Sequence, residues 1–242
     1  MDKKHLLLSS LLLTSSLIAN DAETVYNSTA KFFSFDNLSF NVNSTTKTES
    51  SHKSMSFFVA KGTKNDRSSL LMRFKDPSEI KCTAVLINKT NENTTNYLYF
   101  PSLNRTRIVP SGKSGNEIFG LGISYSELNP QNGTFEPLEE FTQKEEQYYK
   151  VIRTENTLQS HYIIKKSTST IEKIIVYKNG KLEKEMVVEK ITKIKDTPLI
   201  TQWYINDRKK NRLISYSIDE KSISSKINFS LFQKNRLERC VF

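Results

Sequence analysis

Two runs of alternating apolar and polar residues lie between positions 55 and 74 and predict an antiparallel hairpin. Six apolar residues occupy every second position of these runs: Met55, Phe57, Val59, Leu70, Met72 and Phe74. Residues 62–66, between the runs, are typical of a turn. Because successive side chains of a strand point to opposite faces, the six are candidates for one apolar face. Such a face either packs as an ordinary core or lines a cavity, and both readings stay open.

The segments on either side of this hairpin differ in how clearly they predict strands. Residues 82–87 form an apolar run and predict a third strand that is buried on both faces, which suggests that something covers the sheet. A short helix is suggested near residues 25–33. The entirely polar residues 43–51 predict a loose arm or an edge strand.

The second half of the chain predicts a meander of antiparallel strands. Asn179-Gly180 is a strong hairpin signal, because a type I′ turn needs positive φ at both central residues, and it joins residues 171–178 to 181–194. Further strands are predicted at residues 149–154, 161–166, 199–205 and 212–218. A short terminal helix is predicted with Asn228 as its cap and with Phe229, Phe232, Arg236 and Leu237 near one face. The fold class is therefore mainly β, with roughly ten strands and few helices.

Residues 97–128 combine aromatic, cationic and glycine positions. Tyr97 and Tyr99 belong to a short aromatic strand that Pro101 closes, because proline cannot donate to a strand ladder. Arg105 and Arg107 are spaced two apart, so both should leave one face of the following strand. They could meet an anionic group or pair with carboxylates, and the second, structural role is favoured. Gly120 and Tyr125 follow in a glycine-punctuated loop.

The first residues predict export. Lys3 and Lys4 precede an apolar run at residues 6–18, and small Ala19 and Ala22 follow, as in a secretory signal peptide. We expect residues 1–19 to be removed, with cleavage possibly as late as residue 22, and residues 20–242 to form a single domain. No cysteine lies near the cleavage positions, so no lipid anchor is expected there.

The net charge and the cysteine content do not alter the predicted fold. The formal charge is +10, but the lysines alternate with glutamates, which predicts solvated strand faces rather than a nucleic-acid partner. Residues 208–212 are the densest basic cluster and predict a hairpin tip. Cys82 and Cys240 are the only cysteines. Export permits a disulfide, but burial of Cys82 as a free thiol is the favoured interpretation.

Catalytic and metal-binding patterns are missing from the sequence. The three histidines and two cysteines lack metal-ligand spacing, and no nucleophile elbow, phosphate loop or dinucleotide motif occurs. We therefore expect neither an enzyme nor a cofactor or metal site.

The order of motifs resembles the bacterial outer-membrane lipoprotein-sorting protein family, which is related to the LolA and LolB carriers. The matching residues are Arg73-Phe74 with Pro77, Lys81 to Leu86, Tyr97 to Pro101 with Arg105, Arg107 and Ile108, Phe119-Gly120, Ser124-Tyr125 with Leu128, and Leu237-Glu238-Arg239. The chain departs from the family pattern at four positions: Cys82 replaces glycine, Tyr97 replaces tryptophan, and Leu121 and Gly122 replace serine and aspartate.

The resemblance implies a curved antiparallel sheet that forms an incomplete barrel, covered by a few short helices and holding acyl chains. The six alternating residues become candidates for a hydrophobic cavity, and the family motif supplies candidates for its rim: Tyr97, Tyr99, Pro101, Arg105, Arg107, Gly120 and Tyr125. The expected function is a periplasmic, monomeric carrier that passes a lipid or lipoprotein acyl chains towards the outer membrane or a transporter.

Two other functions stay open at this point. One is a non-carrier accessory subunit that binds an inner-membrane lipid exporter. The other is a glycosylated surface protein, suggested by eight N-x-S/T triplets.

Overall fold

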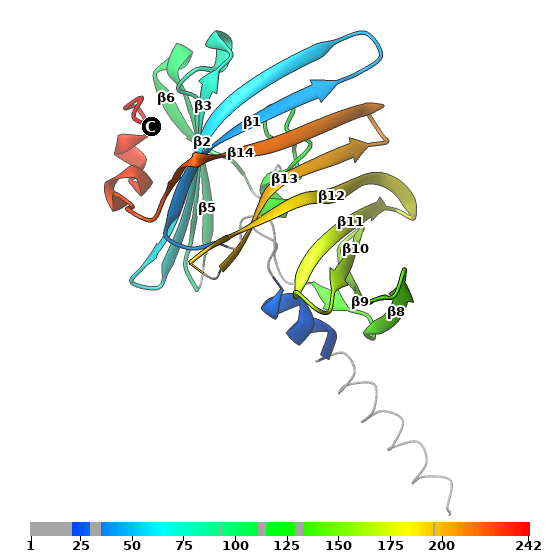
Figure 1. Cartoon of the computed structure of the whole chain (residues 1–242). Helices are drawn as coiled ribbons and strands as arrows, with labels where there is room; N and C mark the ends of the chain where they lie inside the picture. Colours follow the sequence, from blue (N-terminus) through cyan, green and yellow to red (C-terminus); the bar gives the residue numbers. More distant parts are fainter. Residues whose placement is uncertain (1–20, 30–34, 92, 111–114, 129–132, 196) are drawn as a thin grey trace, which may run out of the picture. The chain divides into compact units, whose positions relative to one another are not determined.

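The chain folds into one large antiparallel sheet with few helices (Figure 1), which confirms the mainly β prediction. The computed structural model describes residues 21–29, 35–91, 93–110, 115–128, 133–195 and 197–242. The strand order is β6-β5-β4-β3-β2-β1-β14-β13-β12-β11-β10-β9-β7, with β8 also paired to β9. Because β6 and β7 end this order, the sheet is open and is not a closed barrel.

The strands are β1 (Leu38–Lys47), β2 (His52–Lys64), β3 (Arg67–Asp76), β4 (Ala84–Lys89), β5 (Thr94–Phe100), β6 (Arg105–Ile108), β7 (Thr134–Phe135), β8 (Glu139–Gln143), β9 (Glu146–Glu155), β10 (Leu158–Lys165), β11 (Thr170–Lys178), β12 (Lys181–Ile194), β13 (Thr197–Asp207) and β14 (Arg212–Ser224). Residues 21–28 are helical. The other helical segments described are α2 (Tyr125–Leu128) and the 3-10 helices η1 (Ser78–Ile80), η2 (Pro101–Leu103), η4 (Phe229–Phe232) and η5 (Lys234–Arg236).

Two compact units make up the chain. Unit 1 comprises residues 1–31, 131–188 and 208–210, and unit 2 comprises residues 32–130, 189–207 and 211–242. Each unit is described separately below, and a single domain over residues 20–242 stays a prediction.

Unit 1 contains the helix at residues 21–28 and the strands β7 to β11. Tyr26 of the helix packs against Phe135 and Tyr162, with ring centroids 5.3 Å and 4.9 Å apart. Asn179 and Gly180 have φ values of 50° and 74°, as a type I′ turn requires, so the predicted hairpin between β11 and β12 is confirmed. The predicted helix near residues 25–33 begins earlier, and residues 30–33 lie outside the described residues.

Unit 2 has a sheet with two apolar faces. Phe57 pairs with Phe74 and Val59 with Met72, so these side chains share one face, which we call the inner face. The intervening residues carry a second cluster on the opposite, outer face, consisting of Phe58, Ala60, Leu71, Ala84, Leu86 and Tyr99. Residues 84–87 are buried on both faces, as the sequence predicts.

Strand β1 corrects one expectation. Residues 43–47, predicted as a loose arm or an edge strand, belong to a ten-residue strand that pairs with both β2 and β14. Its alternation is hidden in the sequence because small polar side chains, Ser44 and Thr46, occupy buried positions beside Phe40 and Val42. Tertiary pairing overrides the weak local pattern here.

The outer face is covered by residues 227–242, which we call the C-terminal strap. Phe232 and Leu237 are buried against Phe58, Leu71 and Leu86 of the sheet. The side chain of Asn228 accepts a 3.0 Å hydrogen bond from the backbone N–H of Ser230, so the predicted cap is confirmed. The single predicted helix is instead two short 3-10 helices, η4 and η5.

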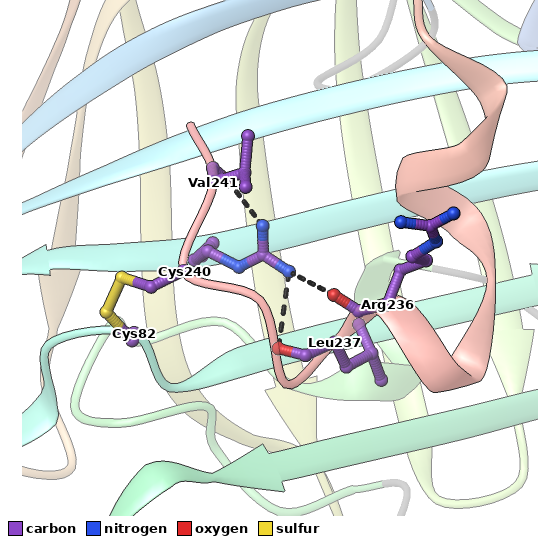
Figure 2. Close-up of a disulfide and its surroundings, with 6 residues drawn as sticks. Cys82, Arg236, Leu237, Cys240 and Val241 are labelled. Carbon is purple, nitrogen blue, oxygen red and sulfur yellow. Dashed lines mark hydrogen bonds between the residues drawn. A yellow bond between two sulfur atoms is a disulfide. The ribbon is translucent and has the colours of Figure 1, made fainter.

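A disulfide (Figure 2) and the buried Arg73 fasten the strap. Cys82 and Cys240 are bonded, with their Cα atoms 5.2 Å apart, so the interpretation of Cys82 as a free thiol is wrong. The guanidinium of Arg73 has no exposed surface and donates to the backbone carbonyls of Val241, Arg236 and Leu237, the last two at 3.4 Å. Three chain-terminal carbonyls are thus satisfied by one side chain.

The predicted signal peptide at residues 1–19 lies outside the described residues. Among the helices that the structure does describe, none has the length and hydropathy needed to cross a membrane.

Candidate functional site

The inner face of unit 2 is the candidate functional site. Rows of paired residues cross it from strand to strand, and one row runs from Phe40 through Val59 and Met72 to Val85. On the other side of β1, Val42 lies opposite Ile218, and Trp203 stacks on Tyr216 with ring centroids 4.8 Å apart. The face is therefore a continuous apolar surface built from six neighbouring strands.

Five of the six predicted cavity residues lie buried on this face. Phe57, Val59, Leu70, Met72 and Phe74 are each no more than 6% exposed, and Met55 is half-buried opposite Ser44. The structure therefore brings the six together, as the alternation predicts. Their role as cavity residues stays a prediction.

Residues 115–128 lie on the inner face, and we call them the covering segment. Ile118, Leu121 and Ile123 are at most 3% exposed. The ring of Phe119 contacts Phe74 edge-on at 4.9 Å and Phe100 at 6.0 Å between centroids. The apolar side chains of this segment therefore take the place next to the sheet that a bound apolar molecule would otherwise occupy.

Polar groups of β13 and β14 hold the covering segment. The hydroxyl of Tyr216 donates to the carbonyl of Leu121. Burial raises the pKa of Tyr216 well above its usual value, so this phenol stays protonated and remains a donor at neutral pH.

Arg212 makes the second attachment. It donates to the carbonyl of Gly120 at 3.2 Å, and ion pairs join it to Glu117 at 2.5 Å and to Asp207 at 2.7 Å. Burial acts to lower the pKa of Arg212, but hydrogen bonds to Glu117 and Asp207 outweigh it and raise that pKa. Arg212 therefore stays charged and ties the segment to β13 and β14.

The segment also depends on two local features. Gly122 has φ +62°, and a Cβ there would lie 2.8 Å from Cδ1 of Ile214, so glycine lets the backbone approach the sheet. Ser124 and Glu127 form a capping box for α2: the Ser124 N–H donates to Glu127 at 2.8 Å, and the Glu127 N–H donates to Ser124 Oγ at 3.3 Å.

The predicted rim residues fall into four places. Tyr97 and Tyr99 belong to the outer-face cluster and Pro101 begins η2, whereas Gly120 and Tyr125 lie in the covering segment. Arg105 and Arg107 are exposed on β6 opposite Phe100 and Leu98. The family motif therefore marks both faces of the sheet rather than one rim.

Sequence reasoning missed several residues of the site. Trp203, Tyr216 and Arg212 belong to it, but their strands are remote in sequence from the covering segment. The alternation of Leu199, Thr201, Trp203 and Ile205 could have indicated an apolar face. Lys61 was also missed: it lies on the inner face between Leu38 and Leu70, where burial lowers its pKa.

The chemistry available on this face is that of an apolar surface. Within the described ranges no group of three or more His, Cys, Asp or Glu could hold a metal ion. Glu117 of the covering segment and Asp207 are each paired with Arg212. If the covering segment were displaced, the inner face could bind apolar groups, because burial of apolar surface area is favourable.

Comparison with known proteins gives a family and a fold. A family model with the description "-like: Uncharacterized protein" matches residues 66–239. None of the curated proteins matches the sequence.

Three solved structures resemble the whole chain. An outer membrane lipoprotein-sorting protein domain from Vibrio parahaemolyticus is 14% identical with a TM-score of 0.78, covering 93% of this chain and 99% of its own. A DUF1329 family protein from Desulfovibrio piger is 13% identical with a TM-score of 0.74, covering 93% and 98%. A LolA superfamily protein from Nitrosomonas europaea is 15% identical with a TM-score of 0.67, covering 91% and 98%. The fold is thus the LolA-like fold.

Proposed function

Because the chain belongs to the family whose model matches residues 66–239 and has the LolA-like fold, we propose that it is a carrier of acyl chains. The cargo is a lipid, or the acyl chains of a lipoprotein, bound on the inner face of unit 2. The carrier works in the periplasm as a monomer, performs no catalysis and passes its cargo towards the outer membrane or a transporter.

The observation that carries this proposal is the covering segment on the inner face. Its apolar side chains, such as Phe119 and Leu121, touch the sheet where an acyl chain would bind. Each methylene group that an acyl chain buries contributes about 0.8 kcal/mol, so a long chain can replace these contacts at little net cost. Cargo and covering segment therefore compete for one surface.

The attachments of the segment suit such an exchange. Besides the apolar packing of Ile118, Leu121 and Ile123, they include the Tyr216 hydrogen bond, the Arg212 contacts and the Phe119 ring contacts, and none of these is covalent. Gly120 and Gly122, both at positive φ, supply backbone positions that can absorb a change of direction. Release of the segment uncovers the face, and its return expels the cargo.

The proposal is tested by lipid extraction and by lipid uptake. Full-length protein exported by bacterial cells is extracted with organic solvent, and mass spectrometry is expected to find lipid in stoichiometric amount. Purified, delipidated protein is then mixed with a fluorescent lysolipid whose emission rises in an apolar site. Phe119→Ser should speed uptake, because it removes two ring contacts of the covering segment.

A matched control is Phe229→Ser, which removes a phenylalanine of the C-terminal strap from the other side of the sheet. Its uptake rate should equal that of the unchanged protein. Protein that carries no lipid after export and takes up no lysolipid contradicts the carrier and favours the accessory subunit of a lipid exporter. A mass shift on glycosidase treatment of native material would instead favour the surface glycoprotein.

A further inference from the structure

The inner face becomes progressively more exposed towards strand β6. Along one row of paired residues, Met72 and Val85 are each 1% exposed, Leu98 is half-buried and Arg107 is exposed. Strand β6 ends the strand order, so no further strand follows it. The apolar face therefore reaches solvent at this edge, and the last side chains on it are cationic.

Arg105 and Arg107 are the two cations at this edge. Arg105 pairs with Phe100 and Arg107 with Leu98, so both leave the sheet on the inner face. Being two residues apart on a strand, their Cα atoms are separated by about 6.5 Å, a spacing at which two guanidinium groups can converge on one anion.

Neither guanidinium has a partner among the described residues. In the ranges that the structure describes, the side chains of Arg105 and Arg107 have no ion pair, hydrogen bond or ring partner. The other two arginines buried in the sheet of unit 2 are both engaged, Arg73 by strap carbonyls and Arg212 by carboxylates. The sequence favoured a structural role in which these arginines pair with carboxylates. The described contacts include no such pair.

An aromatic row leads from the buried face to these cations. Phe57 contacts Phe74 at 5.7 Å between ring centroids, Phe74 contacts Phe119, Phe119 contacts Phe100, and Phe100 lies opposite Arg105. A molecule whose apolar chain takes the place of Phe119, next to Phe74 and Phe100, would place its polar end at Arg105 and Arg107.

Resting on the carrier function proposed above, we infer that Arg105 and Arg107 form a headgroup site that selects cargo with an anionic end. A phosphate or carboxylate joined to an acyl chain fits this site, because guanidinium groups bind such anions bidentately. The acyl chain binds by burying its apolar surface on the inner face. The contact between the anionic headgroup and the two arginines determines which lipid is preferred and how it is oriented.

The test compares two lysolipids with equal acyl chains and different headgroups. The anionic lysolipid is lysophosphatidylglycerol, and the neutral one is a monoacylglycerol, which has no phosphate; both are titrated below their critical micelle concentrations. The unchanged protein is expected to bind the anionic lipid at least about tenfold more tightly, with the ratio falling as salt is added. Arg105→Gln with Arg107→Gln should bring the two affinities within about twofold of each other and leave the affinity for the neutral lipid unchanged.

The control variant combines Lys47→Gln with Arg67→Gln. Both residues are exposed on strands of unit 2, and their positions in the alternation place them on the outer face. This variant loses the same charge and should keep the full preference. Thermal unfolding of both variants checks that the fold is retained.

Each outcome decides a different point. Binding of both lysolipids with no preference, or a preference that survives the Arg105/Arg107 variant, overturns the headgroup site and leaves the carrier standing. Binding of neither lysolipid overturns both. Millimolar inorganic phosphate that displaces the anionic lipid completely would make the site one for a free anion and would also overturn the inference.

Discussion

Two arginines of unit 2, Arg73 on β3 and Arg105 on β6, illustrate how one residue type is used in opposite ways. Arg73 is fully buried, and its two terminal nitrogens donate to three backbone carbonyls of the C-terminal strap. Arg105 is exposed at the edge and has no side-chain partner in the part of the chain that is described. A buried charge needs fixed acceptors, whereas an exposed one remains free to bind.

Gly122 offers a residue-scale prediction about the covering segment. Gly122→Ala should destabilise the protein by about 1–3 kcal/mol, because the added Cβ meets Ile214 and the residue sits at positive φ. Chemical denaturation measures the change in the free energy of unfolding. The same variant should take up lysolipid faster, since the segment packs less closely on the inner face.

Gly115→Ala is the matched control for that prediction. Gly115 lies in the same segment, has no positive φ, and a Cβ there would have no neighbour within 4 Å. Its stability should change by less than about 0.5 kcal/mol. Equal effects of the two alanine substitutions would argue against close packing of the covering segment at Gly122.

Residues with strong local rules could be predicted from the sequence, and residues whose roles depend on distant partners could not. Asn179-Gly180 and Asn228 act within a few positions of themselves, and both are confirmed. Cys82 and Arg212 act on segments 158 and 92 residues away, for which the local pattern holds no signal. The backbone at Cys82 has φ +66°, which fits the glycine that is usual at this position in the family pattern.

The elements of unit 2 form a sheet that is covered on both faces, and each cover is attached differently. The covering segment on the inner face is held by one phenol, one arginine and ring contacts. The strap on the outer face is held by an apolar cluster, a buried arginine and a covalent bond. Only the outer cover is thus bonded covalently to the sheet.

Six alternating residues of β2 and β3 predicted the inner face, but nothing local predicted which cover lies on which side. The disulfide fixes the strap on the outer face. The pairing of β1 with β14 extends the inner face to the strand that holds the covering segment, and both contacts join distant parts of the sequence. Long-range pairing of this kind leaves no periodic trace in either partner alone.

The disulfide gives an element-scale prediction. Cys82→Ser with Cys240→Ser should lower the free energy of unfolding by about 2–5 kcal/mol, because the bond closes a loop between residues 158 apart in sequence. Hydrogen exchange should increase in the strap, at residues 227–242, and stay unchanged in the β11–β12 hairpin of unit 1. Exchange that rises equally in both places would contradict a local role for the bond.

For the whole molecule, the N-terminal region has two roles: its first residues are predicted to direct export, and the helix that follows packs in unit 1. A disulfide between the only two cysteines suits an oxidising compartment, in agreement with the predicted signal peptide. The helix at residues 21–28 is part of unit 1, where Ala22 has no exposed surface and Tyr26 packs on Phe135 and Tyr162. Removal of residues up to 22 would take away the first two residues of that helix, Asp21 and Ala22.

We therefore expect the exported protein to be cleaved after Ala19, so that its first residue is Asn20. Intact-mass measurement of protein secreted by a bacterial host gives the cleavage position directly. Tyr26→Ala should leave that position unchanged but destabilise unit 1 by about 3–5 kcal/mol, the range for loss of a buried aromatic side chain, because the ring of Tyr26 is 7% exposed. A mature chain that begins at Glu23 and is equally stable would show that the start of this helix contributes nothing to the fold.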